Sequence, residues 1–211
     1  MNKIILIGGG GHALSVLEMA EDISLFEGYA DLQENVDMPI PYLGTDEEVM
    51  ANYPAGEFQI HHTLVYAKDV NLNLRQKIIQ KYAAYEKATL IAKTACVTPH
   101  SCIGSGTGVF HGAIINRARI GSNCIVNTGA VIEHNVHAGD NVFVGPNATI
   151  CGGVNIGNNI LIGAGAIIRD DVKICSDVVI GMGSIVTHDI TQTGVYVGCP
   201  AKFVKKLYKY E

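Results

Sequence analysis

The chain has 211 residues, of which 48% are apolar, and its formal net charge is −5. This length suits one large domain or two small ones with a buried core, whereas the acidic balance without a long basic run argues against a nucleic-acid surface. No segment approaches the roughly 20 consecutive apolar residues of a membrane helix, so we expect no membrane insertion.

The first ninety residues alternate strand-like and helix-like segments. The predicted strands are 3–7, 26–30 and 60–67, and the predicted helices are 13–21, 46–52 and 71–84, the last with Leu74, Ile78 and Ile79 on its apolar face. Thr45 and Glu48 have the spacing of a capping box before the second helix. This order predicts an α/β domain over residues 1–90 with a small parallel, Rossmann-like sheet.

A glycine-rich turn, Gly8 to His12, joins the first strand to the first helix. Backbone N–H groups and the positive end of a helix favour phosphate at such a turn. Gly8, Gly10 and Ala13 approximate a dinucleotide fingerprint, and Asp31 follows at the distance of a ribose-binding carboxylate. The turn therefore predicts a nucleotide phosphate site. A tightly packed turn without a ligand is the alternative, and a free nicotinamide cofactor is disfavoured because the segment is too short for two mononucleotide halves.

From Val97 to Val186 an apolar residue recurs at every sixth position, with a single five-residue step between Ile115 and Ile120. The next position is often Gly, and the position four residues later is small or β-branched. A period of six fits neither an α-helix nor a plain strand. Each six-residue unit suits one short strand and one turn, and three units can close a triangular coil. We therefore predict a parallel β-helix in a second domain, residues 91–211.

His134 is the third residue of one such unit, between the inward-facing Ile132 and Val136. Its side chain should therefore project from the coil, where a rigid flank could hold a general base for acyl transfer. A solvated surface histidine is the alternative. A zinc site built from His100, His111 and His134 with His137 is disfavoured within one chain, because His134 and His137 would point in opposite directions along a strand. A site assembled across subunits is the alternative. We expect no metal.

Two further features concern the ends of the chain and its cysteines. The start of the chain does not have the pattern of a signal peptide, since its apolar run is short and glycines follow at once. The six cysteines contain no CxxC pair, which predicts reduced, mostly buried thiols and a cytoplasmic location.

Near the other end, Lys205, Lys206 and Lys209 could attract the phosphates of CoA or form a solvated tail.

Several of these motifs occur together in one known family. They are, in chain order, Gly10-Gly11-His12-Ala13, the six-residue array, Asn127-Thr128, Ile132-Glu133-His134 and Val197-Gly198-Cys199-Pro200-Ala201. With them the chain resembles the bacterial sugar O- and N-acyltransferases of the hexapeptide-repeat type. That family includes sialic acid O-acetyltransferases and N-acetyltransferases of UDP-4-amino-sugars. The resemblance spans essentially the whole chain.

The resemblance implies a left-handed β-helix, a homotrimer, and acetyl-CoA bound between neighbouring β-helices. It implies acetylation of an amino or hydroxyl group of a sugar, expected to be nucleotide-linked, in surface-glycan biosynthesis. His134 would be the general base, followed by Asn135 where the family usually has Asp or Glu. The implied acceptor-binding residues are Gly10, Gly11, His12, Asp31 and Asn127, and the implied acetyl-CoA-binding residues are Phe143, Gly152, Ala164 and Met182.

Four positions depart from the family pattern, one of them at Ala67-Lys68, where the family has a Gly after the third strand. Asn135 cannot stabilise an imidazolium by charge, Phe143 stands where the family often has a second histidine, and Leu32 follows Asp31 where a second acid is usual. Two rival functions therefore stay open. One is a zinc-dependent hydratase of the β-helix carbonic anhydrase type, and the other is a non-catalytic scaffold of a glycan-synthesising complex.

Overall fold

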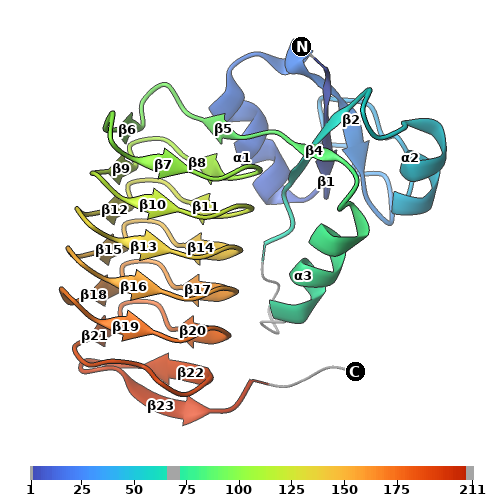
Figure 1. Ribbon diagram of the computed structural model, residues 1–211. Helices are drawn as coiled ribbons and strands as arrows, with labels where there is room; N and C mark the ends of the chain where they lie inside the picture. The colour runs from blue at the N-terminus through green and yellow to red at the C-terminus, as the bar shows by residue number, and fades with distance from the viewer. Residues whose placement is uncertain (1, 66–71, 208–211) are drawn as a thin grey trace. The chain divides into compact units, whose positions relative to one another are not determined.

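The computed structural model describes residues 2–65 and 72–207, and the chain divides into two compact units, Met1–Leu90 and Ile91–Glu211 (Figure 1). In the first unit four parallel strands lie in the order β2-β1-β3-β4, with β1 at Ile4–Ile7, β2 at Phe26–Ala30, β3 at Gln59–His62 and β4 at Glu86–Lys87. The helical segments are α1 at Gly11–Ala20, η1 at Ile23–Leu25, α2 at Asp46–Asn52 and α3 at Leu72–Lys81. The predicted Rossmann-like α/β unit is confirmed.

The local sequence signals predict α2 correctly and the inward face of α3 only in part. The predicted capping box forms, with the Glu48 N–H donating to Thr45 Oγ1 at 3.4 Å and the Thr45 N–H donating to Glu48 Oε2 at 2.8 Å. The predicted apolar face of α3 is confirmed at Ile78, which packs against the core of this unit, but not at Leu74, which is 45% exposed while Leu72 and Arg75 are buried.

The buried guanidinium explains this rotation of α3. Arg75 Nε donates to Leu64 O at 2.8 Å, which holds the Arg75 side of the helix inward. The predicted third strand is also too long, since β3 ends at His62. Residues 66 and 67 of that prediction lie outside the described residues.

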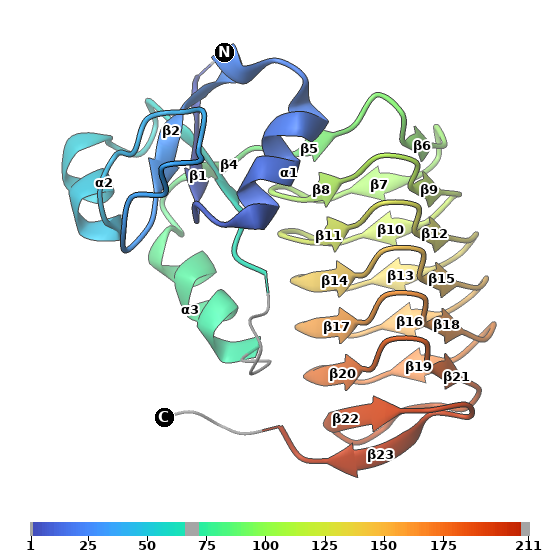
Figure 2. The ribbon, with the colours of Figure 1, turned by 180° about the vertical axis from the view of Figure 1, so that it is seen from behind.

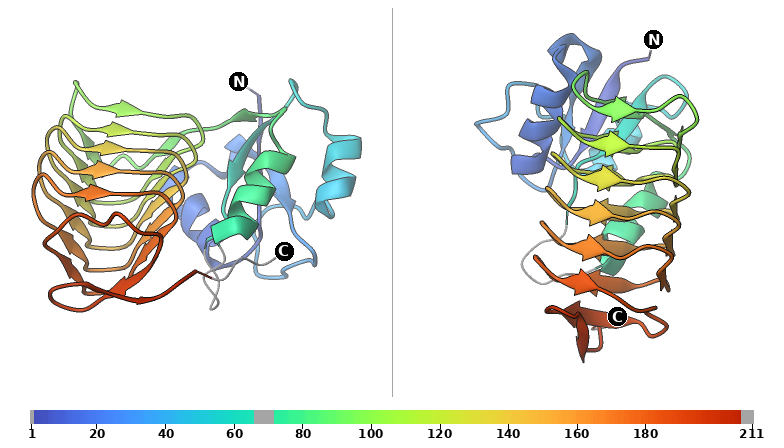
Figure 3. Two further views of the ribbon diagram at one scale, coloured as in Figure 1. Left: turned by 60° about the horizontal axis from the view of Figure 1, so that its bottom comes forward. Right: turned by 90° about the vertical axis from the view of Figure 1, so that its left-hand side faces the viewer.

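The second unit is a left-handed parallel β-helix, as predicted (Figure 2). Its coils contribute strands to three parallel faces, each named here after one of its strands. The β12 face contains β6 (Cys96–Val97), β9 (Ile114–Ile115), β12 (Val131–Ile132), β15 (Thr149–Ile150), β18 (Ile167–Ile168) and β21 (Ile185–Val186). The β13 face contains β7 (Cys102–Ile103), β10 (Arg119–Ile120), β13 (His137–Ala138), β16 (Asn155–Ile156) and β19 (Lys173–Ile174). Figure 3 shows one side of the stack, with its strands lying one above another.

The third face, the β14 face, contains β5 (Leu90–Ile91), β8 (Gly108–Val109), β11 (Ile125–Val126), β14 (Val142–Val144), β17 (Ile160–Ile162) and β20 (Val178–Ile180). Two further strands, β22 (Gly194–Val197) and the antiparallel β23 (Lys202–Lys205), end this sheet. Lys205 therefore belongs to a strand rather than to a tail, and Lys209 lies outside the described residues.

The six-residue pattern sets the interior of the coil. All of its apolar series from Val109 to Val186 is buried, and Val97 and Ile103 pack against the same core. One full turn takes eighteen residues, since Val131 pairs with Thr149 and Thr149 with Ile167. The predicted series is thus confirmed as the inward-facing one.

Each coil turns three corners. The first corner joins the β12 face to the β13 face, as at residues 133–136. The second corner joins the β13 face to the β14 face, as at 139–141, and the third joins the β14 face to the next strand of the β12 face, as at 145–148.

At the corners between residues 104 and 184 one residue has a positive φ, and these positions are almost all Gly, Asn or Asp, including Asn135 at 59°. Those residue types adopt the left-handed region at least cost. Asn135 is therefore the kind of residue that its corner requires.

The cysteines lie mostly at outward positions, so the prediction of mostly buried thiols is wrong. Only Cys124 is buried, while Cys96, Cys102 and Cys199 are exposed, and all six thiols are free. Cys96 and Cys102 are outward-facing strand residues beside the inward-facing Val97 and Ile103. None of the helices in the described part of the chain is long and apolar enough to cross a membrane.

Candidate active site

His134 lies at a first corner of the β-helix, between β12 and β13. Its neighbours at the inward positions, Ile132 and Val136, are fully buried. Because those two side chains fill the coil, the imidazole of His134 projects outward and is exposed to solvent. The rigid ladder on either side fixes the position of its Cα.

Gly152 occupies the same corner on the next coil, directly against the His134 ring. A Cβ atom added to Gly152 would lie 2.7 Å from Cε1 and 2.9 Å from Nε2 of His134. The φ angle of Gly152 is not in the left-handed region, so the imidazole, and not the backbone, requires glycine here. The His134 ring therefore occupies the space that a side chain at position 152 of the neighbouring coil would take.

The backbone N–H of Gly152 differs from its counterparts at the second corner. There the N–H groups of Ser122, Asp140 and Asn158 donate to side chains of the following coil at 2.7, 2.8 and 3.0 Å. Among the hydrogen bonds of the described residues, the Gly152 N–H donates to none, although its carbonyl accepts from Asp171 N at 3.0 Å. A donor beside His134 is thus available to a carbonyl oxygen.

The residues on either side of His134 in the sequence, Glu133 and Asn135, make polar contacts at this corner. Asn135 Nδ2 lies 3.4 Å from His134 Nδ1, a long contact whose donor depends on the imidazole tautomer. Glu133 Oε2 accepts hydrogen bonds from Asn116 Nδ2 at 3.0 Å and from the His134 N–H at 3.3 Å. These bonds tie the His134 backbone to the preceding coil.

The other predicted residues of the β-helix lie elsewhere. Ala164 and Met182 stack on successive coils at the third corner, where Met182 is 81% exposed. Asn127 begins the same corner two coils earlier, and its Oδ1 accepts from Thr128 N at 2.8 Å. Phe143 lies on the β14 face, paired with Ile125 and Leu161. Within one chain, His134 and Gly152 thus share the first corner, and the other four residues do not.

The glycines of the first unit serve two purposes. Gly8 has a φ of 111°, and a Cβ on Gly9 would collide with the Tyr29 ring, so both are required by the fold. Gly10 is the N-cap of α1 without a side-chain cap, and neither Gly10 nor Gly11 has an atom within 4 Å of an added Cβ. The helix N-terminus is therefore open to an anion.

Asp31 and His12 adjoin this open turn. Asp31 Oδ2 accepts from Gly9 N at 2.7 Å, and Oδ1 accepts from Leu32 N at 2.6 Å, so the carboxylate is held at the end of β2. Burial, with smaller effects of His61 and Arg75, lowers the pKa of His12 from 6.5 to about 4. His12 is therefore neutral at pH 7 and would meet a ligand as a hydrogen-bonding group, not as a cation.

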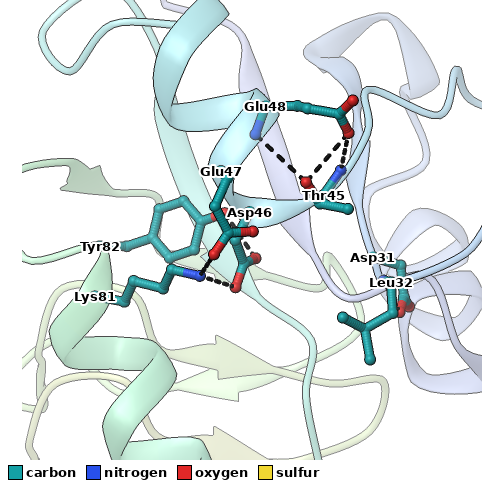
Figure 4. Close-up of polar contacts among 8 residues, drawn as sticks. All are labelled: Asp31, Leu32, Thr45, Asp46, Glu47, Glu48, Lys81 and Tyr82. Atoms are coloured by element: carbon teal, nitrogen blue, oxygen red, sulfur yellow. Dashed lines mark hydrogen bonds and ion pairs between the residues drawn. The ribbon is translucent and has the colours of Figure 1, made fainter.

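Beside the turn, the first unit has a cavity of about 380 Å³. It lies where β1, β2 and β3 end, next to the point where the strand order reverses, which is the usual ligand position in such sheets. Its lining consists of Ile7, Gly8, Ala30, Asp31, Leu32, Asp46, Glu47, Leu64, Leu74, Ile78 and Lys81. Figure 4 shows Lys81 between Asp46 and Glu47, with Asp31 and Leu32 across from them.

Sequence reasoning identified Asp31 but missed most of this lining. Leu64, Leu74 and Lys81 were seen only as parts of a strand or helix. The rule that ligands bind at the carboxyl ends of strands could have indicated Leu64, whereas Lys81 lies at the far end of a helix and gives no such signal. In the described part of the chain, no three side chains of His, Cys, Asp or Glu gather as metal ligands would.

No protein-family model matches this chain, and no curated protein sequence matches it. Several solved structures, however, are similar to this chain. The acetyltransferase domain of PglB from Neisseria gonorrhoeae is 27% identical with a TM-score of 0.86, covering 97% of this chain and 100% of that one. The same domain has been solved in complex with acetyl coenzyme A.

Perosamine N-acetyltransferase from Caulobacter crescentus is similar to the same degree. A histidine-to-asparagine mutant of it, in complex with CoA and GDP-perosamine, is 29% identical with a TM-score of 0.86, covering 98% of each chain. WeeI from Acinetobacter baumannii, at 18% identity and a TM-score of 0.81, shares the fold. The predicted resemblance to bacterial sugar acyltransferases of the hexapeptide-repeat type is confirmed by these likenesses.

Proposed function

We propose that this chain is an acetyl-CoA-dependent acetyltransferase that acts on an amino or hydroxyl group of a nucleotide-linked sugar. The observation that carries the proposal is the outward imidazole of His134 lying against Gly152. That arrangement offers a proton acceptor beside a backbone donor, which acyl transfer requires. The similar structures support the substrates, because they hold acetyl coenzyme A in one case and CoA with GDP-perosamine in another.

The reaction assigns one role to each of these groups. Nε2 of His134 takes the proton from the sugar amine or hydroxyl as that atom attacks the thioester carbonyl. The carbonyl oxygen becomes an oxyanion and accepts the Gly152 N–H. When the C–S bond breaks, the imidazolium returns its proton to the departing CoA sulfur, so that the products are the acetylated sugar and free CoA.

Asn135 sets the tautomer that this mechanism needs. Nε2 can accept a proton only if the hydrogen of the neutral ring is on Nδ1. Asn135 must then present Oδ1, not Nδ2, to His134 Nδ1. A half-turn of the amide exchanges these two atoms at nearly the same position.

The first unit would hold the acceptor. The N–H groups of Gly10 and Gly11 at the start of α1 suit the diphosphate, and Asp31 suits ribose hydroxyls. His12 would donate or accept one hydrogen bond as a neutral imidazole. In this scheme the nucleotide is bound by one unit and the acetyl group is transferred on the other.

A homotrimer would complete the catalytic site. The outward positions of the β12 face are mostly apolar, with Ile114 and Ile167 each 41% exposed, whereas those of the β13 face include Arg119, His137 and Lys173. The β12 face is bounded by the first corner on one side and the third corner on the other. If three copies turn this face toward a common axis, the first corner of one copy meets the third corner of the next.

In that arrangement acetyl-CoA would lie between two copies. His134 and Gly152 of one copy would hold the thioester, while Ala164, Met182 and Phe143 of the next would line the rest of the ligand, with Asn127 near the acceptor. Replacing Ile167 by Lys should therefore abolish both the trimer, measured by light scattering, and turnover. Asn155→Lys, at the equivalent strand position of the β13 face, is the matched control and should leave both intact.

The rival functions have less support. Zinc hydratases of the β-helix carbonic anhydrase type carry two ligands five residues apart, a spacing that His134 and His137 do not have. If the chain were a non-catalytic scaffold, nothing would explain why glycine occupies position 152, where a Cβ would collide with the His134 ring. The six free thiols favour a reducing compartment, which supports a cytoplasmic location, and an acceptor linked to a nucleotide supports a role in surface-glycan synthesis.

The decisive experiment is a CoA-release assay with the full chain and acetyl-CoA. The acceptors are UDP-, dTDP-, GDP- and CMP-linked sugars, with 4-amino sugars included. At least one should release free thiol at a rate that depends on the acceptor. Release with none of them would support the scaffold and overturn the proposal.

A further inference from the structure

One end of the first unit's cavity is formed by a fixed group of charged side chains (Figure 4). Lys81 Nζ lies 2.9 Å from Asp46 Oδ2 and 2.8 Å from Glu47 Oε1, and the Tyr82 hydroxyl donates to Asp46 Oδ1 at 2.8 Å. The capping box at Thr45 fixes the start of α2, and with it Asp46 and Glu47. The group is therefore held in place before any ligand arrives.

Apart from Asp31, the remaining walls of the cavity are apolar, and part of this apolar surface is exposed to solvent. Ile7, Ala30, Leu64 and Ile78 line it, and Leu32 is 87% exposed. Large exposed apolar side chains beside a concave site are typical of ligand-binding surfaces. A flat ring lying between such walls would bury apolar area without needing further hydrogen bonds.

The charged group has more acceptors than donors. It presents two carboxylates and one ammonium, and Glu47 keeps most of its surface in solvent, with its side chain 75% exposed. Each carboxylate oxygen has two lone pairs, so Glu47 can accept further hydrogen bonds while it remains paired with Lys81. A ligand edge that fits should offer two adjacent donors to a carboxylate and one acceptor to the ammonium.

Among the nucleobases, guanine has that edge. Its N1–H and N2–H₂ are adjacent donors, and its O6 beside them is an acceptor. Uracil and thymine have one N–H between two carbonyl oxygens, and a carbonyl facing a carboxylate is repelled. Cytosine and adenine each have a single amino donor followed by acceptors. Only guanine pairs both of its donors with Glu47 while its carbonyl meets Lys81.

We propose that this cavity binds the base of the nucleotide-linked acceptor and selects guanine, with Glu47 accepting from N1–H and N2–H₂ and Lys81 donating to O6. The inference rests on the proposed function and specifies its substrate as a guanosine-diphosphate sugar. Asp31, at the other side of the cavity, adjoins the ribose, and Gly10 and Gly11 hold the diphosphate.

The test is calorimetric titration of the full chain with GDP, UDP, dTDP, CDP and ADP at one salt concentration. GDP should bind at least about tenfold more tightly than the others, since one charge-assisted hydrogen bond is worth roughly that factor. Glu47→Gln should lower GDP affinity about tenfold and leave UDP affinity unchanged, because the lost bond serves guanine alone. Glu57→Gln, an exposed acid that does not line the cavity, is the control.

The outcomes distinguish a failure of the guanine assignment from a failure of the proposed function. Equal or tighter binding of UDP, dTDP, CDP or ADP would overturn the choice of guanine and leave the acetyltransferase proposal standing. The choice also fails if Glu47→Gln weakens all five nucleotides equally. Binding of no nucleotide would overturn both this inference and the nucleotide-linked acceptor, and the CoA-release assay would then decide whether a free sugar is acetylated.

Discussion

The β-helix and the α/β unit position their functional side chains in different ways. In the β-helix every coil repeats the same backbone, so a residue such as Gly152 that the corner does not require stands out against the pattern. In the α/β unit the cavity is lined from the ends of three strands and from two helices, and no period connects those segments. A repeat can therefore place the catalytic residues at one corner of an otherwise uniform backbone. Ligand recognition in the α/β unit depends instead on contacts between segments distant in sequence.

The largest expected effect is the loss of turnover when His134 is replaced, and it tests whether the catalytic residue lies in the β-helix. His134→Ala should reduce kcat by roughly 10²–10⁴, the usual worth of a general base. Binding of acetyl-CoA and of the nucleotide should be unchanged, because the ring is exposed and its removal leaves no cavity in the core. CoA release and calorimetric binding measure the two properties. His137→Ala on the following strand is the control, and near-normal turnover of the His134 variant would remove that residue from the mechanism.

The second prediction separates the two units by their response to acid. Burial, with a smaller contribution from Arg75, lowers the pKa of His61 to about 4 and that of His62 to about 3. Because the unfolded chain binds protons near pH 6.5 and the folded unit does not, stability is complete above pH 6.5 and falls as the pH drops toward 4. Each such histidine contributes a slope of up to about 1.4 kcal/mol per pH unit.

Hydrogen exchange measured by mass spectrometry would follow both units separately between pH 7.5 and 5. Peptides from β1 and β3 should lose protection as the pH falls. His62→Phe should reduce the pH slope, since Phe keeps the edge contact of this ring with Tyr82, whose centroid is 6.0 Å away, and binds no proton. A slope unaffected by this substitution would show that His62 is not the titrating group.

The same contrast explains what the sequence could predict. The inward series, the outward His134 and the Thr45 cap follow from local spacing, and the structure contains all three. The rotation of α3 could not be predicted, because it depends on a hydrogen bond between Arg75 and the distant Leu64 carbonyl. The contact between His134 and Gly152 became visible only when successive coils were placed in register. Lys81 joined Asp46 and Glu47 only through the tertiary fold.

The third prediction concerns the contact between coils. Gly152→Ala would place a methyl group about where the His134 ring lies, and displacing a catalytic group by about 1 Å can cost up to about 100-fold in rate. The fold should persist, because the backbone angle of Gly152 suits alanine. In the His134→Ala background the same substitution should cost nothing further. A double-mutant cycle of kcat therefore measures the contact, and additive losses would contradict it.

The smallest expected effect is a gain in rate. Asn135→Asp keeps a residue type that tolerates the positive φ of this corner, as Asp171 does at the same corner two coils later. The new carboxylate would accept from His134 Nδ1 without any choice of orientation and would stabilise the imidazolium by charge. A charge-assisted hydrogen bond exceeds a neutral one by about 1 kcal/mol, so kcat should rise about fivefold. Asn135→Ala, which removes the acceptor, should lower it by a similar factor. If aspartate and alanine slow turnover equally, Asn135 serves the backbone of the corner and does not orient the base.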